Sequence, residues 1–101
     1  KFVNLTVLNF GWCQCLTQIT DVSGLPNLEE LSFELCKNLT TVHGSIDFLD
    51  KLKILSTFKC TKLGSLPPIK LISLEKLELS YCSSLESFPE ILVKMEKIKK
   101  L

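Results

Sequence analysis

The sequence predicts an α/β repeat fold, a right-handed solenoid with short parallel strands on the concave face and irregular, 3₁₀ or short helical turns on the convex face. Three observations predict this fold. Leucine-like residues recur at a nearly constant spacing, cysteines recur with the same period, and prolines and glycines interrupt the segments between them. A period of about 20 to 29 residues is typical of folds in which each unit buries its apolar face against the next unit.

The repeating units begin at leucine-like residues, which are Leu5, Leu28, Leu52, Leu74 and Ile98. The steps between these positions are 23, 24, 22 and 24 residues, so the units span about 5–27, 28–51, 52–73 and 74–97, with another starting at 98–101. Each unit follows the pattern L-x-x-L-x-L-x-x-C-x-x-L-x-x-I, which is typical of a cysteine-type leucine-rich repeat. We therefore interpret residues 1–101 as one leucine-rich-repeat segment, an uncapped fragment of a longer protein.

A short strand is expected in each unit, around its second and third apolar positions. Apolar and polar side chains alternate there, as in a strand with one buried face. The second column contains Leu8, Leu31, Leu55, Leu77 and Leu101, and the third contains Phe10, Phe33, Leu79 and one polar exception, Thr57. Strands of successive units are expected to pair in parallel at a spacing of ~4.8 Å.

The segment that returns from each strand to the next contains helix breakers, which are Pro67, Pro68, Pro89, Gly24, Gly44 and Gly64. Proline lacks a backbone N–H and clashes with the preceding helical turn, so it opposes long helices. Apolar columns continue through these segments, at Val22, Ile46, Ile69 and Ile91 and at Leu25, Leu49, Leu71 and Met95. We expect loops with short 3₁₀ or helical turns on this convex side.

Four cysteines occupy one column and form a structural ladder: Cys13, Cys36, Cys60 and Cys82. A cysteine that turns inward after the strand packs as a small hydrophobe and donates weakly to a backbone carbonyl. Spacing alone leaves disulfides between ladder neighbours open. A thiol in every unit favours a reducing compartment, the cytoplasm or the nucleus. Cys15 lies outside the ladder and is expected at the surface.

Charge and composition oppose several classes of partner. The formal charge is +1, and acids and bases are mixed along the chain, so neither nucleic acid nor a membrane is expected to bind. No apolar run approaches the ~20 residues that a membrane span needs. The one basic cluster, formed by Lys94, Lys97, Lys99 and Lys100, is interpreted as a solvated face.

No catalytic, cofactor-binding or metal-binding residues are expected. Cys13 and Cys15 form the one close cysteine pair, and no second pair or nearby histidine completes a zinc site. His43 is the sole histidine and takes the loop position that Pro67 and Pro89 occupy in later units. No base or acid shares a site with it, and a glycine-rich phosphate loop is lacking, so we expect no enzyme activity in this segment.

Outward strand positions are left free for a protein partner. The column before the ladder contains large side chains of the kind that anchor interfaces. We predict a partner-binding concave face at Trp12, Glu34, Leu35, Phe58, Lys59, Glu78 and Tyr81. The alternative is that these side chains cover the edge of the turn and shield its backbone. A further outward column, Thr6, Glu29, Lys53 and Glu75, alternates in charge and is interpreted as self-neutralising support.

Two stretches, Leu79–Ile91 (LSYCSSLESFPEI) and Leu25–Phe33 (LPNLEELSF), resemble the repeats of plant intracellular immune receptors that carry a TIR domain, a nucleotide-binding domain and leucine-rich repeats. Departures from that pattern are Thr20 and His43 in place of proline, Thr57 in place of an apolar residue, and the additional Cys15. The resemblance implies a protein-interaction module that recognises pathogen effectors, contacts the receptor's own nucleotide-binding domain in autoinhibition, and takes part in defence signalling. Nucleotide binding and TIR activity would lie outside this segment.

Two other classes remain open. Substrate adaptors of ubiquitin ligases resemble ~26-residue units with regular outer helices, which the shorter units and the prolines disfavour. A secreted receptor ectodomain would explain the glycosylation-like triplets Asn4-Leu5-Thr6 and Asn38-Leu39-Thr40. Plant ectodomains resemble an L-x-G-x-I-P pattern that this chain lacks. The sequence upstream of this segment decides between the three classes. A phosphate-binding loop would indicate the immune receptor, an F-box the ubiquitin-ligase adaptor, and a signal peptide the secreted ectodomain.

Overall fold

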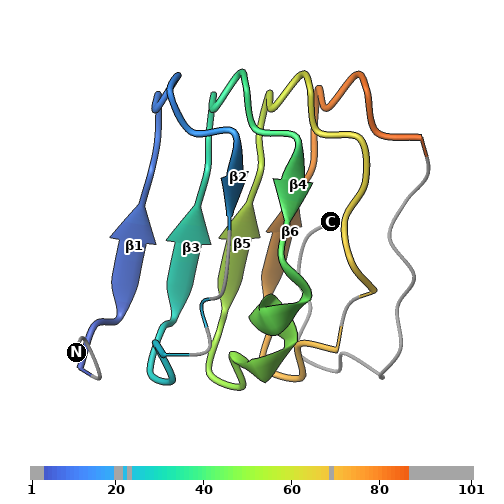
Figure 1. Ribbon diagram of the computed structural model, residues 1–101. Helices are drawn as coiled ribbons and strands as arrows, with labels where there is room; N and C mark the ends of the chain where they lie inside the picture. The colour runs from blue at the N-terminus through green and yellow to red at the C-terminus, as the bar shows by residue number, and fades with distance from the viewer. Residues whose placement is uncertain (1–3, 20–21, 23, 69, 87–101) are drawn as a thin grey trace.

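The computed structural model describes residues 4–19, 22, 24–68 and 70–86. Strands β1 (Val7–Asn9), β3 (Glu30–Ser32), β5 (Ile54–Ser56) and β6 (Lys76–Glu78) form one parallel sheet in this order. They lie side by side and point the same way (Figure 1). Because spatial neighbours follow one another in sequence and run parallel, the chain returns outside the sheet between each pair of strands.

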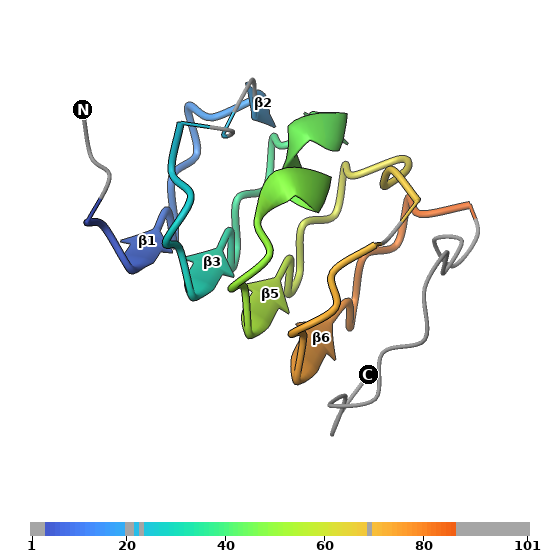
Figure 2. The ribbon, with the colours of Figure 1, turned by 90° about the horizontal axis from the view of Figure 1, so that it is seen from below.

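The return segments form a second layer opposite the sheet (Figure 2). In this layer β2 (Gln18–Ile19) pairs in parallel with β4 (Thr41–Val42), and a 3₁₀ helix, η1, spans Gly44–Phe48. The 3₁₀ helix agrees with the short turns expected there. The small second sheet was not predicted, because strands of two residues are too short to show an alternating pattern.

The register of the main sheet places like residues opposite one another. Leu8 pairs with Leu31, Leu31 with Leu55 and Leu55 with Leu77. Sequence steps of 23, 24 and 22 residues therefore bring the second apolar column into line. The limits of the units stay a prediction, and several residues of the predicted pattern lie outside the described ranges: Thr20, Ile69, Pro89, Ile91, Lys94, Met95, Lys97, Ile98, Lys99, Lys100 and Leu101.

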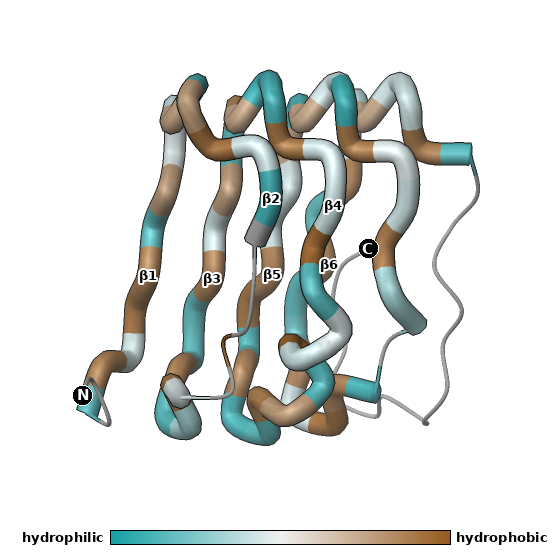
Figure 3. Tube along the Cα trace, in the orientation of Figure 1, coloured by the Kyte–Doolittle hydropathy of each residue, from teal (hydrophilic) through white to brown (hydrophobic). Residues whose placement is uncertain are grey.

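The core lies between the two layers and is built from the apolar columns. Figure 3 shows apolar residues recurring at matching places in successive units. Leu31, Leu55 and Leu77 are fully buried, whereas Leu8 in the first unit is only partly buried against the core. The rings of Phe10 and Phe33 stack with their centroids 5.5 Å apart. The apolar residues of each unit are therefore buried mainly by contacts with neighbouring units, rather than by contacts within the unit.

Candidate functional site

The ladder cysteines join each unit to the one before it. The Sγ atoms of Cys36, Cys60 and Cys82 each donate to a main-chain carbonyl oxygen at 3.0 Å, those of Phe10, Phe33 and Thr57 respectively. Each of these oxygens also accepts the N–H of the cysteine in its own turn, at 3.0 Å in all three cases. The ladder thus fixes the turns that follow the strands, at the edge of the sheet face.

The inner thiols are shielded from solvent. Burial raises the pKa of the Cys60 thiol to about 12 and also raises the pKa of Cys36. All five cysteines are free, and Cys13 and Cys15 are exposed. Because the thiolate is the reactive form, we expect the buried thiols of Cys36 and Cys60 to react slowly, whereas the two exposed cysteines are accessible to reagents.

Thr57, the polar exception in the third column, is fully buried. Its hydroxyl lies 3.5 Å from the Sγ atom of Cys82, and its carbonyl oxygen accepts the Cys82 thiol. Among the described residues, every buried side-chain nitrogen and oxygen has a hydrogen-bond partner. The ladder therefore accommodates this hydroxyl inside the core.

The outer face of the sheet is hollowed. A hollow of about 380 Å³ spans all four strands and is lined by Asn9, Glu30, Ser32, Glu34, Ile54, Ser56, Phe58, Lys76 and Glu78. Glu34, Phe58 and Glu78 of the predicted partner-binding face lie in its lining. The other six lie on the strands, at the outward positions that alternation predicts to be free for a partner, but they were not in the predicted partner-binding set.

The side chains in the middle of the hollow accept hydrogen bonds from the turns that follow their own strands. The side-chain oxygens of Asn9, Ser32 and Ser56 each accept a backbone N–H two residues later, at 2.7, 3.4 and 3.4 Å. In the last unit Oε1 of Glu78 accepts both the N–H and the hydroxyl of Ser80, at 3.2 and 2.6 Å. These bonds restrict the rotamers of the lining and connect the hollow to the turns.

The remaining predicted residues form a row beside the hollow, which we call the turn row: Trp12, Leu35, Lys59 and Tyr81. All four have left-handed backbone, with φ of 67°, 60°, 57° and 63°. Each is the third residue of a turn closed by the cysteine N–H, the type II position that normally favours glycine. A side chain there costs roughly 1 kcal/mol or more. Hydrophobic patterning could not predict this strain, because it concerns the backbone alone.

Large side chains of the turn row are nevertheless exposed, Trp12 by 65% and Tyr81 by 69%. The rings of Phe58 and Tyr81 meet edge to face with centroids 5.8 Å apart. Nζ of Lys59 lies 5.4 Å from each of the two ring centroids. This contact supports the alternative that part of the turn row covers the edge of the turns. The exposed surface of the same rings nevertheless leaves them accessible to a partner.

The charged column at the start of the strands contains an ion pair. Nζ of Lys53 lies 3.8 Å from Oε1 of Glu29, and both side chains are about half exposed. The carbonyl of Lys53 also accepts the N–H of Glu75 at 2.7 Å. An exposed pair of this kind contributes at most about 1 kcal/mol, so its role is local support.

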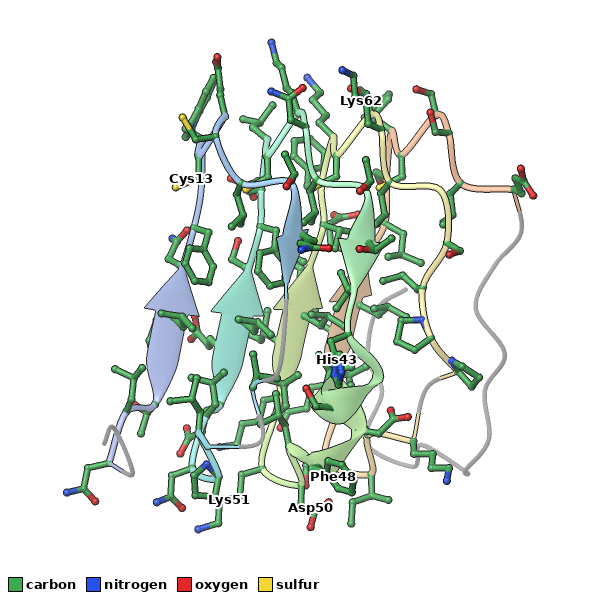
Figure 4. The ribbon with its side chains drawn as sticks, viewed as in Figure 1. Cys13, His43, Phe48, Asp50, Lys51 and Lys62 are labelled. Atoms are coloured by element: carbon green, nitrogen blue, oxygen red, sulfur yellow. The ribbon has the colours of Figure 1, made fainter. Side chains whose placement is uncertain are left out.

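The sequence features outside the sheet face have structural partners. Nδ1 of His43 accepts the N–H of Ser45 at 3.0 Å and caps η1. Asn38 of the second glycosylation-like triplet donates through Nδ2 to the carbonyl of Gln14 at 2.7 Å. In Figure 4 His43 lies beside η1, and Cys13 lies at the edge of the molecule where β1 leads out of the sheet.

Within residues 4–19, 22, 24–68 and 70–86, no three His, Cys, Asp or Glu side chains are grouped so that they could hold a metal ion. No helix in that part of the chain has the length and apolar character to cross a bilayer.

Comparison with known proteins gives several plant disease resistance proteins. TMV resistance protein N of Nicotiana glutinosa is 37% identical over 93 residues, which are 92% of this chain and 8% of that protein. Disease resistance protein RPP5 of Arabidopsis thaliana is 47% identical over 77 residues, 75% of this chain and 5% of that protein. Disease resistance protein RML1A of Arabidopsis thaliana is 32% identical over 95 residues, 93% of this chain and 10% of that protein.

The chain therefore spans a tenth or less of the length of these relatives. No protein-family model matches it, and no solved structure matches it significantly. The aligned region nevertheless covers most of the chain. The chain belongs to the plant disease resistance proteins of the TIR, nucleotide-binding and leucine-rich-repeat class, of which it matches a short segment.

Proposed function

We propose that this chain is a protein-interaction module of a plant immune receptor, part of a right-handed leucine-rich-repeat solenoid whose sheet face binds a protein partner. The hollow of about 380 Å³ across all four strands is the observation that supports it. Inward columns are alike from unit to unit and form the core, so the outward positions alone are free to differ. Parallel strands joined by crossovers are right-handed in about 98% of cases, which supports the handedness.

The partner in this proposal is a pathogen effector or the receptor's own nucleotide-binding domain. Binding to the first would signal infection, and binding to the second would hold the receptor inactive. The proposal places the segment in the cytoplasm or nucleus, in keeping with its free thiols. It gives the segment no catalysis, cofactor, metal, nucleic acid or membrane contact, because the sheet face offers protein-binding chemistry instead.

Trp12, Phe58 and Tyr81 are the anchors we assign to this surface. Aromatic side chains often supply most of the energy of an interface, because they bury large areas at low entropic cost. Four strands at ~4.8 Å spacing give a face about 20 Å wide. A standard interface buries about 800 Å² on each partner, so this segment supplies part of such an interface.

The test is alanine substitution of Trp12, Phe58 and Tyr81 in the full receptor, scored for recognition and for activity in uninfected tissue. We expect recognition to fall, or activity without infection to rise, while the protein accumulates normally. Phe48→Ala is the matched control, because Phe48 is 70% exposed but lies on η1, in the layer opposite the sheet (Figure 2). Normal recognition and normal resting activity in the triple variant would contradict the proposal.

A further inference from the structure

Resting on the proposed function, we propose that the hollow selects a basic partner segment and takes an arginine side chain between β3 and β5. The hollow is lined by Glu30, Glu34 and Glu78, against the single cation Lys76. The chain as a whole carries a formal charge of +1. The negative charge is therefore a property of this hollow and not of the protein.

The acidic and apolar parts of the hollow adjoin each other. Glu30 and Glu34 lie at outward positions on and just after β3, and both are exposed. In the sheet register Glu30 is opposite Ile54 on β5. Phe58, which follows β5, and Ile54 are both partly buried and also line the hollow. A strip of carboxylates thus runs beside an apolar strip.

Arginine matches this pairing better than lysine. Its planar guanidinium can bind a carboxylate such as that of Glu30 or Glu34 through two parallel N–H donors, whereas the Phe58 ring already has Nζ of Lys59 5.4 Å from its centroid. Its methylene stem can cover an aliphatic side chain such as Ile54. The ammonium of lysine is a compact, strongly hydrated charge that cannot make this two-donor planar contact with a carboxylate.

The lining also defines where the basic residue sits. Lys76 is opposite Ile54 on the far side of β5 from Glu30. Its charge repels a cation at β6 and so directs an arginine towards β3. Ser32, between Glu30 and Glu34, and Ser56, between Ile54 and Phe58, already accept the N–H groups of their own turns, so less side-chain entropy is lost on binding.

The test measures binding of fluorescein-labelled Gly-Arg-Leu-Arg-Gly to the 101-residue chain by fluorescence anisotropy, with lysine and glutamate analogues of the peptide. We expect the arginine peptide to bind about tenfold tighter than the glutamate peptide, tighter than the lysine peptide, and more weakly at high salt. Equal binding of the arginine and glutamate peptides, or no dependence on salt, would overturn the charge assignment. Equal binding of the arginine and lysine peptides would overturn the assignment of arginine.

Two variants make the test specific to the hollow. The double substitution Glu30→Lys and Glu34→Lys should weaken the arginine peptide by about tenfold, and Glu30→Gln with Glu34→Gln should do so with little change in shape. The control carries the same charge change outside the hollow, at exposed Asp50 and Glu86 (Asp50→Lys, Glu86→Lys). Circular dichroism checks that each variant is folded. Unchanged affinity in the glutamine variant would overturn the proposal.

The two proposals fail separately. If charge reversal leaves peptide binding intact while alanine at Trp12, Phe58 and Tyr81 still abolishes recognition by the receptor, the sheet face remains the interaction surface and the basic partner is wrong. If the alanine substitutions have no effect on the receptor, the interaction surface itself is wrong.

Discussion

The thiol of Cys60 donates a hydrogen bond to the carbonyl oxygen of Phe33 at 3.0 Å, across the boundary between two units. The same oxygen accepts the N–H of Cys36 at 3.0 Å, so one acceptor stabilises a turn and also joins that turn to the next unit. Because both residues are fully buried, this bond is made away from water. We therefore expect this contact, in the turns at the edge of the proposed binding face, to contribute to the stability of the chain.

Removing this thiol should destabilise the chain. We expect Cys60→Ala to lower the free energy of unfolding by about 1 to 3 kcal/mol, because it removes a hydrogen bond and leaves a small cavity. Cys60→Ser, which keeps a donor, should lose less. Urea unfolding monitored by circular dichroism measures both, and exposed Cys15→Ala is the control, with a change within about 0.5 kcal/mol. A Cys60→Ala variant as stable as this control would contradict the prediction.

The reactivity of the cysteine thiols should depend on their exposure to solvent. At pH 8 iodoacetamide should modify Cys13 and Cys15, which are exposed, and leave Cys60 unmodified, because burial raises its pKa to about 12 and suppresses the thiolate. Cys36 should be protected for the same reason. Mass spectrometry of a tryptic digest locates the labels, and unfolding in urea should expose all five sites. Early labelling of Cys60 in the folded chain is the contrary result.

Stability should fall in alkaline solution. The ordinary thiol pKa is 9.0, and in the folded chain that of Cys60 is about 12, so above pH 9 the unfolded state releases a proton that the folded state keeps. The stabilisation from the neutral thiol is complete below pH 9 and is lost as the pH rises towards 12. Urea midpoints between pH 8 and pH 11 measure this loss. The Cys60→Ser variant should show a shallower decline, and an identical decline would exclude Cys60 as the cause.

Glycine should be more stable than alanine in the left-handed backbone of the turn row. Trp12 has a φ of 67° and is 65% exposed, so Trp12→Gly relieves strain while removing little buried surface. We expect Trp12→Gly to be more stable than Trp12→Ala by about 1 kcal/mol, and both to lose the same partner affinity. Thermal unfolding of the two variants gives the difference. Equal stability of the two would show that the left-handed turn is not strained.

The buried hydroxyl of Thr57 should be dispensable. Thr57→Val fills nearly the same volume and keeps the carbonyl that accepts the Cys82 thiol. We expect unfolding free energy to be unchanged or to rise by up to ~1 kcal/mol, because a polar group leaves an apolar site. Thr57→Ala, the cavity control, should instead destabilise by about 1 kcal/mol or more. A loss in Thr57→Val as large as in Thr57→Ala would show that the hydroxyl bond is required.

Periodicity predicted the inward residues well, because burial in stacked units follows directly from the spacing of apolar side chains. Leu31, Phe33 and Leu55 are fully buried, as their columns require. The ion pair between Glu29 and Lys53 followed from charge alternation in register. The pattern of apolar and polar residues does not report backbone conformation, so the left-handed φ of Leu35 was not predicted. Nor did they show that Ser32 would hold its own turn.

The candidate site was predicted only in part for the same reason. The prediction favoured the turn row because its side chains are large. The hollow instead lies over the strands and is lined by smaller and charged residues such as Ser56 and Glu30. A hollow depends on which neighbours are short, and this is a relation between units that no single unit reveals. Phe58 connects the two, since it lines the hollow and its ring contacts that of Tyr81 in the turn row.

The distance in sequence from the first leucine to the ladder cysteine is constant, from Leu5 to Cys13 and from Leu28 to Cys36, whereas the length from the cysteine to the next unit varies. The sheet keeps its register despite steps of 23, 24 and 22 residues, so the layer with β2, β4 and η1 absorbs the difference. Insertions and deletions arising there during evolution would leave the geometry of the sheet face intact. Point substitutions on that face would then change the proposed binding surface one position at a time without disturbing the register of the sheet.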